Sequence, residues 1–431
     1  MSAAKPRGFV TPEFAPLVRA LELYVPARGP GGAVLSVHHR GQLVANLAVG
    51  TRDRDGALMQ PETLVMGLST VKGVTATLLH IIADRGIIDL AAPVARYWPE
   101  FAQAGKRDIT VHELVSHRAG LYMLPDTIER IEDIYDWERM VGALARAKPA
   151  HAPGRDLGYH AWTFGWLVGE LLQRATGALF SDLLRECIAK PLALTGCYIG
   201  LPDSEHHRVA KIIQVQTGEP PRSGAARSLV SQAPALAQAG IGMGIGLGSK
   251  VTRALGLRFD PAQAMRAMAP PGLSQLNLNA PAFLRAVIPS VNGVFDAISL
   301  SRIYAALANG GELGGVRLLS RAAIDRARAD QSVGLGRVIP FPLRVKMGYH
   351  RPVSLGVRVS MFGRDRDLGI ASADAFGHFG LGGSGAWADP ERELSVAVVT
   401  NCFVGRLPAD LRTVGVCTAA NFAADRRSPS S

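Results

Sequence analysis

The chain has 431 residues, of which 48% are hydrophobic and 19% are charged, so it is long and apolar enough to bury one large core or two. Its formal net charge is +11, but the 47 Lys and Arg residues are spread along the chain without a block of five or more. This spread and the few aromatic residues argue against a nucleic-acid partner. The composition predicts a folded globular protein.

The four cysteines form no Cys-x-x-Cys pair and lie far apart, at Cys187, Cys197, Cys402 and Cys417. The sequence therefore predicts buried thiols, with neither a zinc site nor a disulfide framework. Residues 1–26 contain no basic start followed by an apolar core and a cleavage site. We therefore expect no secretory signal and a cytoplasmic location.

Two apolar runs, 33–37 and 43–49, flank the polar turn at 40–42 and predict a β-hairpin. From position 69 to about 180 the hydrophobic period is helical, most clearly over 74–83, 109–116 and 161–175. A further helix is predicted over 296–307. Short apolar runs then predict strands at 341–345, 357–362, 375–379 and 394–400.

This order predicts an α/β (α+β) fold, with an antiparallel sheet built from both chain ends, helices on its faces and a mostly helical insertion. We expect one unit over 1–431. Its α/β part is predicted to comprise 1–70 with 290–431, and its mainly helical insertion 71–289.

The segment Ser228–Ser249 has no charged residue and is long enough to cross a bilayer. Its glutamines, its proline and five alternating glycines predict a loop instead of a spanning helix. The glycines imitate a dinucleotide loop, but no strand-like run precedes them and no acidic residue follows at the required distance. We expect either a lid beside a substrate cleft or a surface connection, and no membrane span.

The most informative motif is Ser69-Thr70-Val71-Lys72. A spacing of three residues at a helix start puts Ser69 and Lys72 on one face, where a buried amine can take a proton from the hydroxyl. The alternative is that Ser69 is a helix N-cap. A second match, Ser2-Ala3-Ala4-Lys5, lies in an unpatterned N-terminus, whereas Ser69 follows an apolar, strand-like run. The motif points to acyl transfer.

A serine nucleophile also needs a group that carries protons and donors for an oxyanion. Tyr159 follows a Gly-rich turn and enters an apolar helix, so its phenol can project into a cleft; the alternative is a half-buried tyrosine held by one hydrogen bond. Residues 376–385 read as a Gly-rich strand edge that another molecule can approach. The alternative there is an ordinary strand and turn that merely exposes His378.

The order of these motifs resembles the serine β-lactamase-like (penicillin-binding) family and is most similar to its class C branch and to the family VIII carboxylesterases. Residues 108–121 are similar to the family's leucine-rich His-x-x-Gly-Leu segment. Residues 377–390, continuing into 394–401, resemble its final strand pair. The resemblance covers nearly the whole chain.

The resemblance implies that Ser69 is the acylated nucleophile, Lys72 its activating neighbour and Tyr159 the proton acceptor. The pKa of the Tyr159 phenol is then expected to be lowered by Lys72, so that it can act at neutral pH. The oxyanion donors would be the backbone N–H groups of Ser69 and Leu381.

The substrate-binding residues implied by the resemblance are His378, Gly380 and His160. His378 fills the place of the lysine in the family's Lys-Thr-Gly motif, and Ala161 stands where its β-lactamases have the asparagine of Tyr-x-Asn. Ala161 has no amide to hold an acylamido side chain, and His378 replaces the lysine that meets a carboxylate. Both departures favour neutral esters over antibiotics.

The leading prediction is a serine carboxylesterase that acts through an acyl-enzyme on a small-molecule ester, without a cofactor. An acyltransferase with the same intermediate and a weak β-lactamase are the alternatives. A catalytically silent, ligand-binding homologue is a further one. No metal is expected, because His112 and His117 are five residues apart, where the zinc-protease helix needs four. Ser384 lacks a complete Gly-x-Ser-x-Gly elbow.

Overall fold

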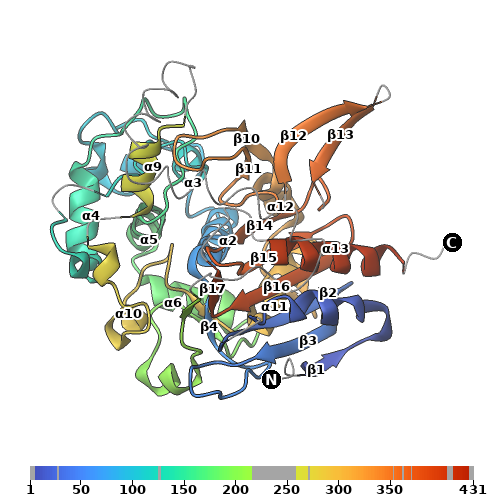
Figure 1. The fold of residues 1–431 in the computed structure, drawn as a ribbon. Helices are drawn as coiled ribbons and strands as arrows, with labels where there is room; N and C mark the ends of the chain where they lie inside the picture. Colours follow the sequence, from blue (N-terminus) through green and yellow to red (C-terminus); the bar gives the residue numbers. More distant parts are fainter. Residues whose placement is uncertain are drawn as a thin grey trace.

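A six-stranded antiparallel sheet lies at the centre of the α/β part, in the order β1-β3-β2-β16-β15-β14 (Figure 1). The computed structural model describes residues 5–26, 29–124, 128–215, 259–269, 272–352, 354–361, 364–369, 371–404 and 411–426. The predicted loop or lid at Ser228–Ser249 lies outside the described residues. The strands of the sheet are β1 (Arg7–Val10), β2 (Gly32–His39), β3 (Gln42–Gly50), β14 (Phe376–Phe379), β15 (Gly385–Asp389) and β16 (Leu394–Thr400).

The two chain ends meet where β16 pairs with β2. The predicted hairpin is confirmed, since β2 and β3 pair from Gly32 with Gly50 to His39 with Gln42. β16 then pairs antiparallel with β2, with Val396 opposite Val37. The side chains of these three strands are almost all buried, because helices cover both faces of the sheet. The predicted fold class is therefore confirmed.

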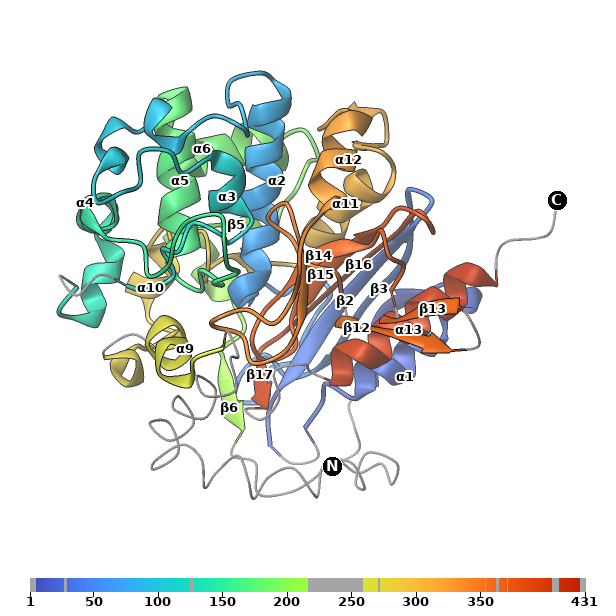
Figure 2. The same ribbon diagram turned by 90° about the horizontal axis from the view of Figure 1, so that it is seen from above.

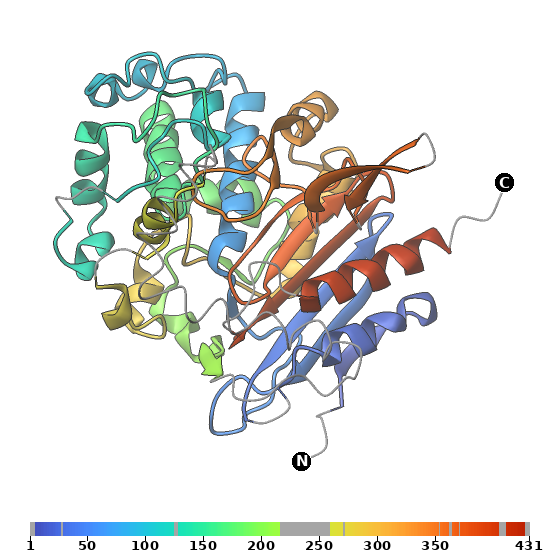
Figure 3. The ribbon, with the colours of Figure 1, turned by 45° about the horizontal axis from the view of Figure 1, so that its top comes forward.

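One face of the sheet is covered by α1 (Pro16–Glu22) and α13 (Leu411–Asp425), which lie side by side although they belong to opposite ends of the chain (Figures 2 and 3). Leu17, Trp387 and Val416 are fully buried in the core between them and the sheet. The other face is covered by α11 (Ala297–Ala308), which contacts β2, β15 and β16. The sequence reasoning did not predict α1 or α13, whereas β15 lies within residues 377–390, which resemble part of the family's final strand pair.

The helical part lies beside the sheet and is built around α2 (Val71–Asp84) and α5 (Thr163–Thr176), which pack against each other. Both confirm predicted helices, as do α3 and α11. The other helices described are α3 (Val111–Val115), α4 (Trp137–Arg146), α6 (Phe180–Leu184), α9 (Pro261–Met268), α10 (Pro281–Arg285) and α12 (Arg321–Arg328), with a π-helical turn at Arg185–Ala189 after α6. The division into two parts at 70 and 290 stays a prediction.

Short strand pairs complete the described architecture. They are β4 (Val65–Met66), β5 (Cys197–Tyr198) and β7 (Val294–Phe295) in one sheet, and the pairs β6 (Ile213–Val215) with β17 (Cys402–Val404), β8 (Glu312–Leu313) with β9 (Val316–Arg317), β10 (Asp330–Gly334) with β11 (Leu343–Lys346), and β12 (Ser354–Met361) with β13 (Arg364–Gly369). All four cysteines are buried free thiols, as predicted. Within the described ranges, no helix combines the length and apolar character that a membrane span requires.

The strand β14 forms the last strand of the large sheet, and its outer side faces the helical part. It contacts the 3₁₀ turn Leu68–Thr70 and the start of α2. This contact brings His378 of β14 to the helix that carries Lys72: a Cβ built on Gly73 would lie 3.2 Å from the Cβ of His378. The two motifs, more than 300 residues apart in sequence, therefore share one junction.

Candidate active site

Ser69 lies in a tight turn between β4 and α2. Leu68 takes a left-handed conformation with φ +46°, which is uncommon for a residue with a side chain. The turn is held by the hydrogen bond from Gly67 N–H to the carbonyl of Gly293, at 2.9 Å. The residue that precedes α2 is Thr70, and no side chain caps the helix there. The structure thus does not place Ser69 at the N-cap position of α2.

Lys72 is fully buried and lies 3.1 Å from the Ser69 hydroxyl, measured from Nζ to Oγ. Its Nζ also donates to the backbone carbonyls of Ala161 and Ser290, both at 2.7 Å. Burial holds the pKa of Lys72 well below its ordinary value. The charged amine donates to Ser69 Oγ as well; the neutral amine has two N–H bonds for the two carbonyls and one lone pair for Ser69. This is the geometry of a base for the hydroxyl proton.

Ser290 is a part of this arrangement that sequence reasoning missed. Its hydroxyl donates to the carbonyl of Trp162 at 2.5 Å, and the neighbouring Pro289 carbonyl accepts from Thr75 at 2.7 Å. These bonds fix the segment whose carbonyl orients Lys72. Because a backbone carbonyl is the same in every residue, the sequence offers no signal for it.

Tyr159 lies against both residues of the motif. Its side chain hydrogen-bonds Ser69, and Nζ of Lys72 is 5.1 Å from the centre of its ring. The expectation of a lowered phenol pKa is wrong, since burial raises the pKa of Tyr159 above its ordinary value. The physical reason is that burial disfavours the charged phenolate more than the hydrogen bond with Ser69 favours it. At neutral pH the resting phenol keeps its proton.

Two histidines behind Tyr159 hold its segment. The backbone N–H of His160 donates to Nδ1 of His117 at 3.2 Å, and the two Nδ1 atoms are 3.3 Å apart. Nε2 of His160 accepts from the backbone N–H of Leu121 at 3.1 Å. Both ring nitrogens of His160 thus have protein partners, and its predicted role in substrate binding stays a prediction. His117, whose ring is 4.9 Å from that of Tyr159, was assigned no role from sequence.

The end of β14 lies beside the turn that carries Ser69. A Cβ on Gly380 would come within 2.3 Å of the carbonyl oxygen of Gly67, so only glycine fits there. The next residue, Leu381, has a side chain that is 66% exposed, and its contribution to an oxyanion site is through the backbone. The proximity is consistent with the predicted pair of donors, Ser69 N–H and Leu381 N–H, which stays a prediction.

His378 is buried, and its ring centre lies 6.1 Å from that of Tyr159 and 4.6 Å from that of His350. His350 is a second neighbour that sequence reasoning missed. Its backbone N–H and carbonyl pair with Gly377 of β14, at 2.9 and 3.1 Å. His350 therefore extends the edge of the sheet by one bridge.

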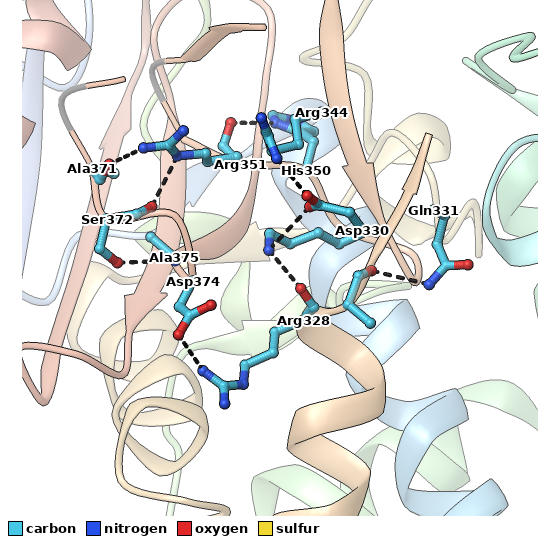
Figure 4. A network of polar contacts seen from close by, with 12 residues as sticks. Arg328, Asp330, Gln331, Arg344, His350, Arg351, Ala371, Ser372, Asp374 and Ala375 are labelled. Carbon is cyan, nitrogen blue, oxygen red and sulfur yellow. Dashed lines mark hydrogen bonds and ion pairs between the residues drawn. The ribbon is translucent and has the colours of Figure 1, made fainter. Parts of the chain in front are cut away.

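A polar network anchors the segment that carries His350 (Figure 4). Arg351 donates to the carbonyls of Ala371 at 2.5 Å and Ser372 at 2.9 Å, while Arg344 pairs with Asp330 at 2.5 Å. These guanidinium groups are engaged by carbonyl and carboxylate oxygens of the protein. The network holds His350 in position through backbone and charge contacts.

The histidines around the junction are neutral. Burial is the main cause that lowers the pKa values of His117 and His378 well below the ordinary value, that of His350 to about 4 and that of His160 to about 3. Burial also lowers the pKa of Lys72, and the four neutral histidines add no positive charge around it. The centre they surround is suited to an uncharged substrate group.

The two alternatives weighed from the sequence occupy other places. His112 hydrogen-bonds Gln331 at 2.5 Å, away from the partners of His117, and the described residues contain no cluster of three or more groups that could hold a metal. Ser384 is buried and accepts from the backbone N–H of Thr400 at 3.1 Å. That hydroxyl has a structural contact.

A sheet made from both chain ends, a helical part beside it and a Ser-x-x-Lys helix at their junction define the class of serine β-lactamase-like folds. The sequence model of the Beta-lactamase family matches residues 18–416, and the chain belongs to this family. The Esterase/beta-lactamase LipL of Mycobacterium tuberculosis is 36% identical over 398 residues, which is 91% of this chain and 82% of that protein.

Two solved structures cover 97% of this chain and 99% of their own chains. One is a penicillin-binding protein homologue from Caulobacter crescentus, with 32% sequence identity and a TM-score of 0.78. The other is a family VIII carboxylesterase, with 31% identity and a TM-score of 0.77. The resemblance inferred from the motifs is therefore confirmed.

Proposed function

We propose that this protein is a serine hydrolase that cleaves carboxylic esters through an acyl-enzyme on Ser69. The observation that carries the proposal is the position of Lys72: fully buried, bound to two carbonyls and 3.1 Å from the Ser69 hydroxyl. A serine hydroxyl needs an adjacent base to become nucleophilic, and this amine has its lone pair free for that role. The similarity to an esterase/β-lactamase and to a family VIII carboxylesterase supports ester hydrolysis.

In the acylation step, Ser69 Oγ bonds to the ester carbonyl carbon while its proton passes to Nζ of Lys72. The negative charge on the carbonyl oxygen is stabilised by the backbone N–H groups of Ser69 and Leu381. When the C–O bond to the alcohol breaks, the leaving oxygen takes a proton from the Tyr159 phenol, and the Lys72 ammonium returns its proton to the phenolate. The raised pKa of Tyr159 suits a group that donates first.

In deacylation, Lys72 again acts first as a base and then as an acid. A water molecule attacks the acyl carbon and gives a proton to Lys72 as the second tetrahedral intermediate forms. Collapse then releases the carboxylic acid, and Ser69 recovers its proton from Lys72. The free thiols of the four cysteines support a cytoplasmic site of action, which is part of this proposal.

The test compares Ser69→Ala with Ser2→Ala, the matched control that removes the serine of the second Ser-x-x-Lys in the chain. Hydrolysis of p-nitrophenyl butyrate is expected to disappear in Ser69→Ala and to persist in Ser2→Ala. Intact mass after treatment with a fluorophosphonate should rise by one adduct in the wild type and in Ser2→Ala, but not in Ser69→Ala. Full turnover by folded Ser69→Ala would refute the proposal.

A further inference from the structure

The hydrogen bonding of His378 fixes which of its ring nitrogens is a donor. Nδ1 lies 3.2 Å from the carbonyl oxygen of Phe379. A carbonyl oxygen can only accept, so Nδ1 carries the proton and Nε2 of the neutral ring holds a lone pair. Burial, together with the neighbouring His350, keeps the pKa of His378 well below the ordinary value, so Nε2 is not protonated at neutral pH.

That lone pair has no protein partner within the described part of the chain. Nε2 of His378 is buried, and the side chain is only 1% exposed. A buried acceptor without a donor costs about as much as a lost hydrogen bond, on the order of 1–3 kcal/mol. The ring lies beside Tyr159, which itself contacts Ser69, so this unpaired acceptor belongs to the reaction centre.

We propose that Nε2 of His378 accepts a hydrogen bond from the acyl part of the substrate, so that the site selects esters whose acyl group bears a donor such as a hydroxyl. This inference rests on the proposed function and specifies its substrate class. The acyl part is favoured over the alcohol because His378 lies in β14 (Phe376–Phe379), and Leu381, the predicted backbone donor to the ester carbonyl oxygen, follows that strand by two residues.

The same geometry rejects a carboxylate on the acyl group. A carboxylate can only accept hydrogen bonds, so it would face the His378 lone pair without a donor between them. Lys72 is occupied by its two carbonyl partners, and Arg351 by the carbonyls of Ala371 and Ser372 (Figure 4). The lysine that the family's Lys-Thr-Gly motif would place here is a hydrogen-bond donor, whereas Nε2 of His378 is an acceptor.

The experiment measures kcat/KM for five esters. Three are p-nitrophenyl esters of similar size: the butyrate, the 3-hydroxybutyrate and the anionic hemisuccinate. The other two are the monobutyrate of ethylene glycol, which has its hydroxyl in the alcohol part, and ethyl butyrate as its control. The wild type is expected to prefer the 3-hydroxybutyrate over the butyrate by about tenfold, the usual effect of pairing one buried polar group. Hemisuccinate should be the poorest p-nitrophenyl ester.

Two variants of His378 separate the hydrogen bond from ring packing. His378→Phe keeps an aromatic ring but has no acceptor. Its kcat/KM values for the hydroxybutyrate and the butyrate should differ by no more than about twofold. His378→Lys supplies a donor, and its hemisuccinate-to-butyrate ratio should rise about tenfold over that of the wild type. His350→Phe is the matched control: it removes the neighbouring imidazole and should keep the hydroxyl preference.

Each outcome bears on a different statement. Equal kcat/KM values for butyrate and 3-hydroxybutyrate in an active wild type would overturn the inference and leave the proposed function standing. Preference only for the glycol ester over an ethyl butyrate control would overturn the assignment to the acyl part. If the preference for the hydroxy ester were lost in His350→Phe but kept in His378→Phe, the acceptor would be His350, and the inference about His378 would be overturned. Absence of hydrolysis of every ester would refute the proposed function itself.

Discussion

Gly73 follows the base Lys72 on α2 and faces the core in a way that leaves no room for a side chain. A Cβ built there would lie 1.9 Å from the hydroxyl oxygen of Tyr304 and 3.2 Å from Cζ of the same ring. Tyr304 is fully buried, and its hydroxyl has no hydrogen-bond partner among the residues that the structure describes. The hydroxyl, not the ring, is therefore the obstacle.

We predict that Gly73→Ala destabilises the protein and that Tyr304→Phe restores it. Overpacking of a core costs about 1–3 kcal/mol. Replacing glycine by alanine inside a helix stabilises the helix by roughly 0.5–1 kcal/mol. Gly73→Ala should therefore lower the free energy of unfolding by about 1–2 kcal/mol in total. Tyr304→Phe alone removes a buried, unpaired hydroxyl and should stabilise by about 1 kcal/mol. In the double variant the nearest ring atom is Cζ at 3.2 Å, which small adjustments accommodate.

The measurement is urea unfolding of the wild type, both single variants and the double variant, followed by circular dichroism. The coupling free energy between the two positions should be about 1 kcal/mol or more, favouring the double variant. Gly142→Ala is the matched control, because a Cβ there meets only a flexible Arg146 nitrogen at 3.5 Å; it should stabilise α4 by about 0.5–1 kcal/mol. Additive effects of Gly73→Ala and Tyr304→Phe, within about 0.5 kcal/mol, would refute the steric argument.

Three further predictions concern chemistry and pH. Lys72→Met and Tyr159→Phe should each lower kcat for p-nitrophenyl butyrate by about 10²-fold or more, with a double variant scarcely worse, because both act on one proton path; a near-wild-type Tyr159→Phe would make the phenol a structural tether. Nitrocefin should be a much poorer substrate than p-nitrophenyl butyrate, because Ala161 and His378 lack the amide and the ammonium that recognise such drugs; similar kcat/KM values would make β-lactam hydrolysis the leading function. Burial lowers the pKa of His80 to about 4, below the 6.5 of the unfolded chain, so the unfolded state binds more protons between these values and stability falls as pH drops from 7 to 5. Its share is about 2 kcal/mol at pH 5, and His80→Gln should show a correspondingly smaller loss in urea unfolding at pH 5; an equal loss in both proteins would contradict the low pKa.

The local patterns of the chain were sufficient for much of the fold. The hairpin β2–β3, the helices α2, α5 and α11, and the strand β16 each have a regular hydrophobic period that a single segment displays. The helix α13 was missed because its apolar residues are mostly alanine, cysteine and valine on all sides, which gives little contrast between its faces. The sequence predicted only that both chain ends share a sheet; it did not predict that β16 pairs with β2.

The sequence by itself also determined that Ser69 and Lys72 are neighbours, because a spacing of three residues on a helix fixes which side chains lie together. Only the tertiary structure decided the charges and the partners. Lys72 is held by the carbonyls of Ala161 and Ser290, and the unpaired nitrogen of His378 depends on burial beneath a strand edge. A pKa and an unpaired acceptor are properties of everything packed around a group, so residues distant in the chain set them, and no local pattern records which residues those are.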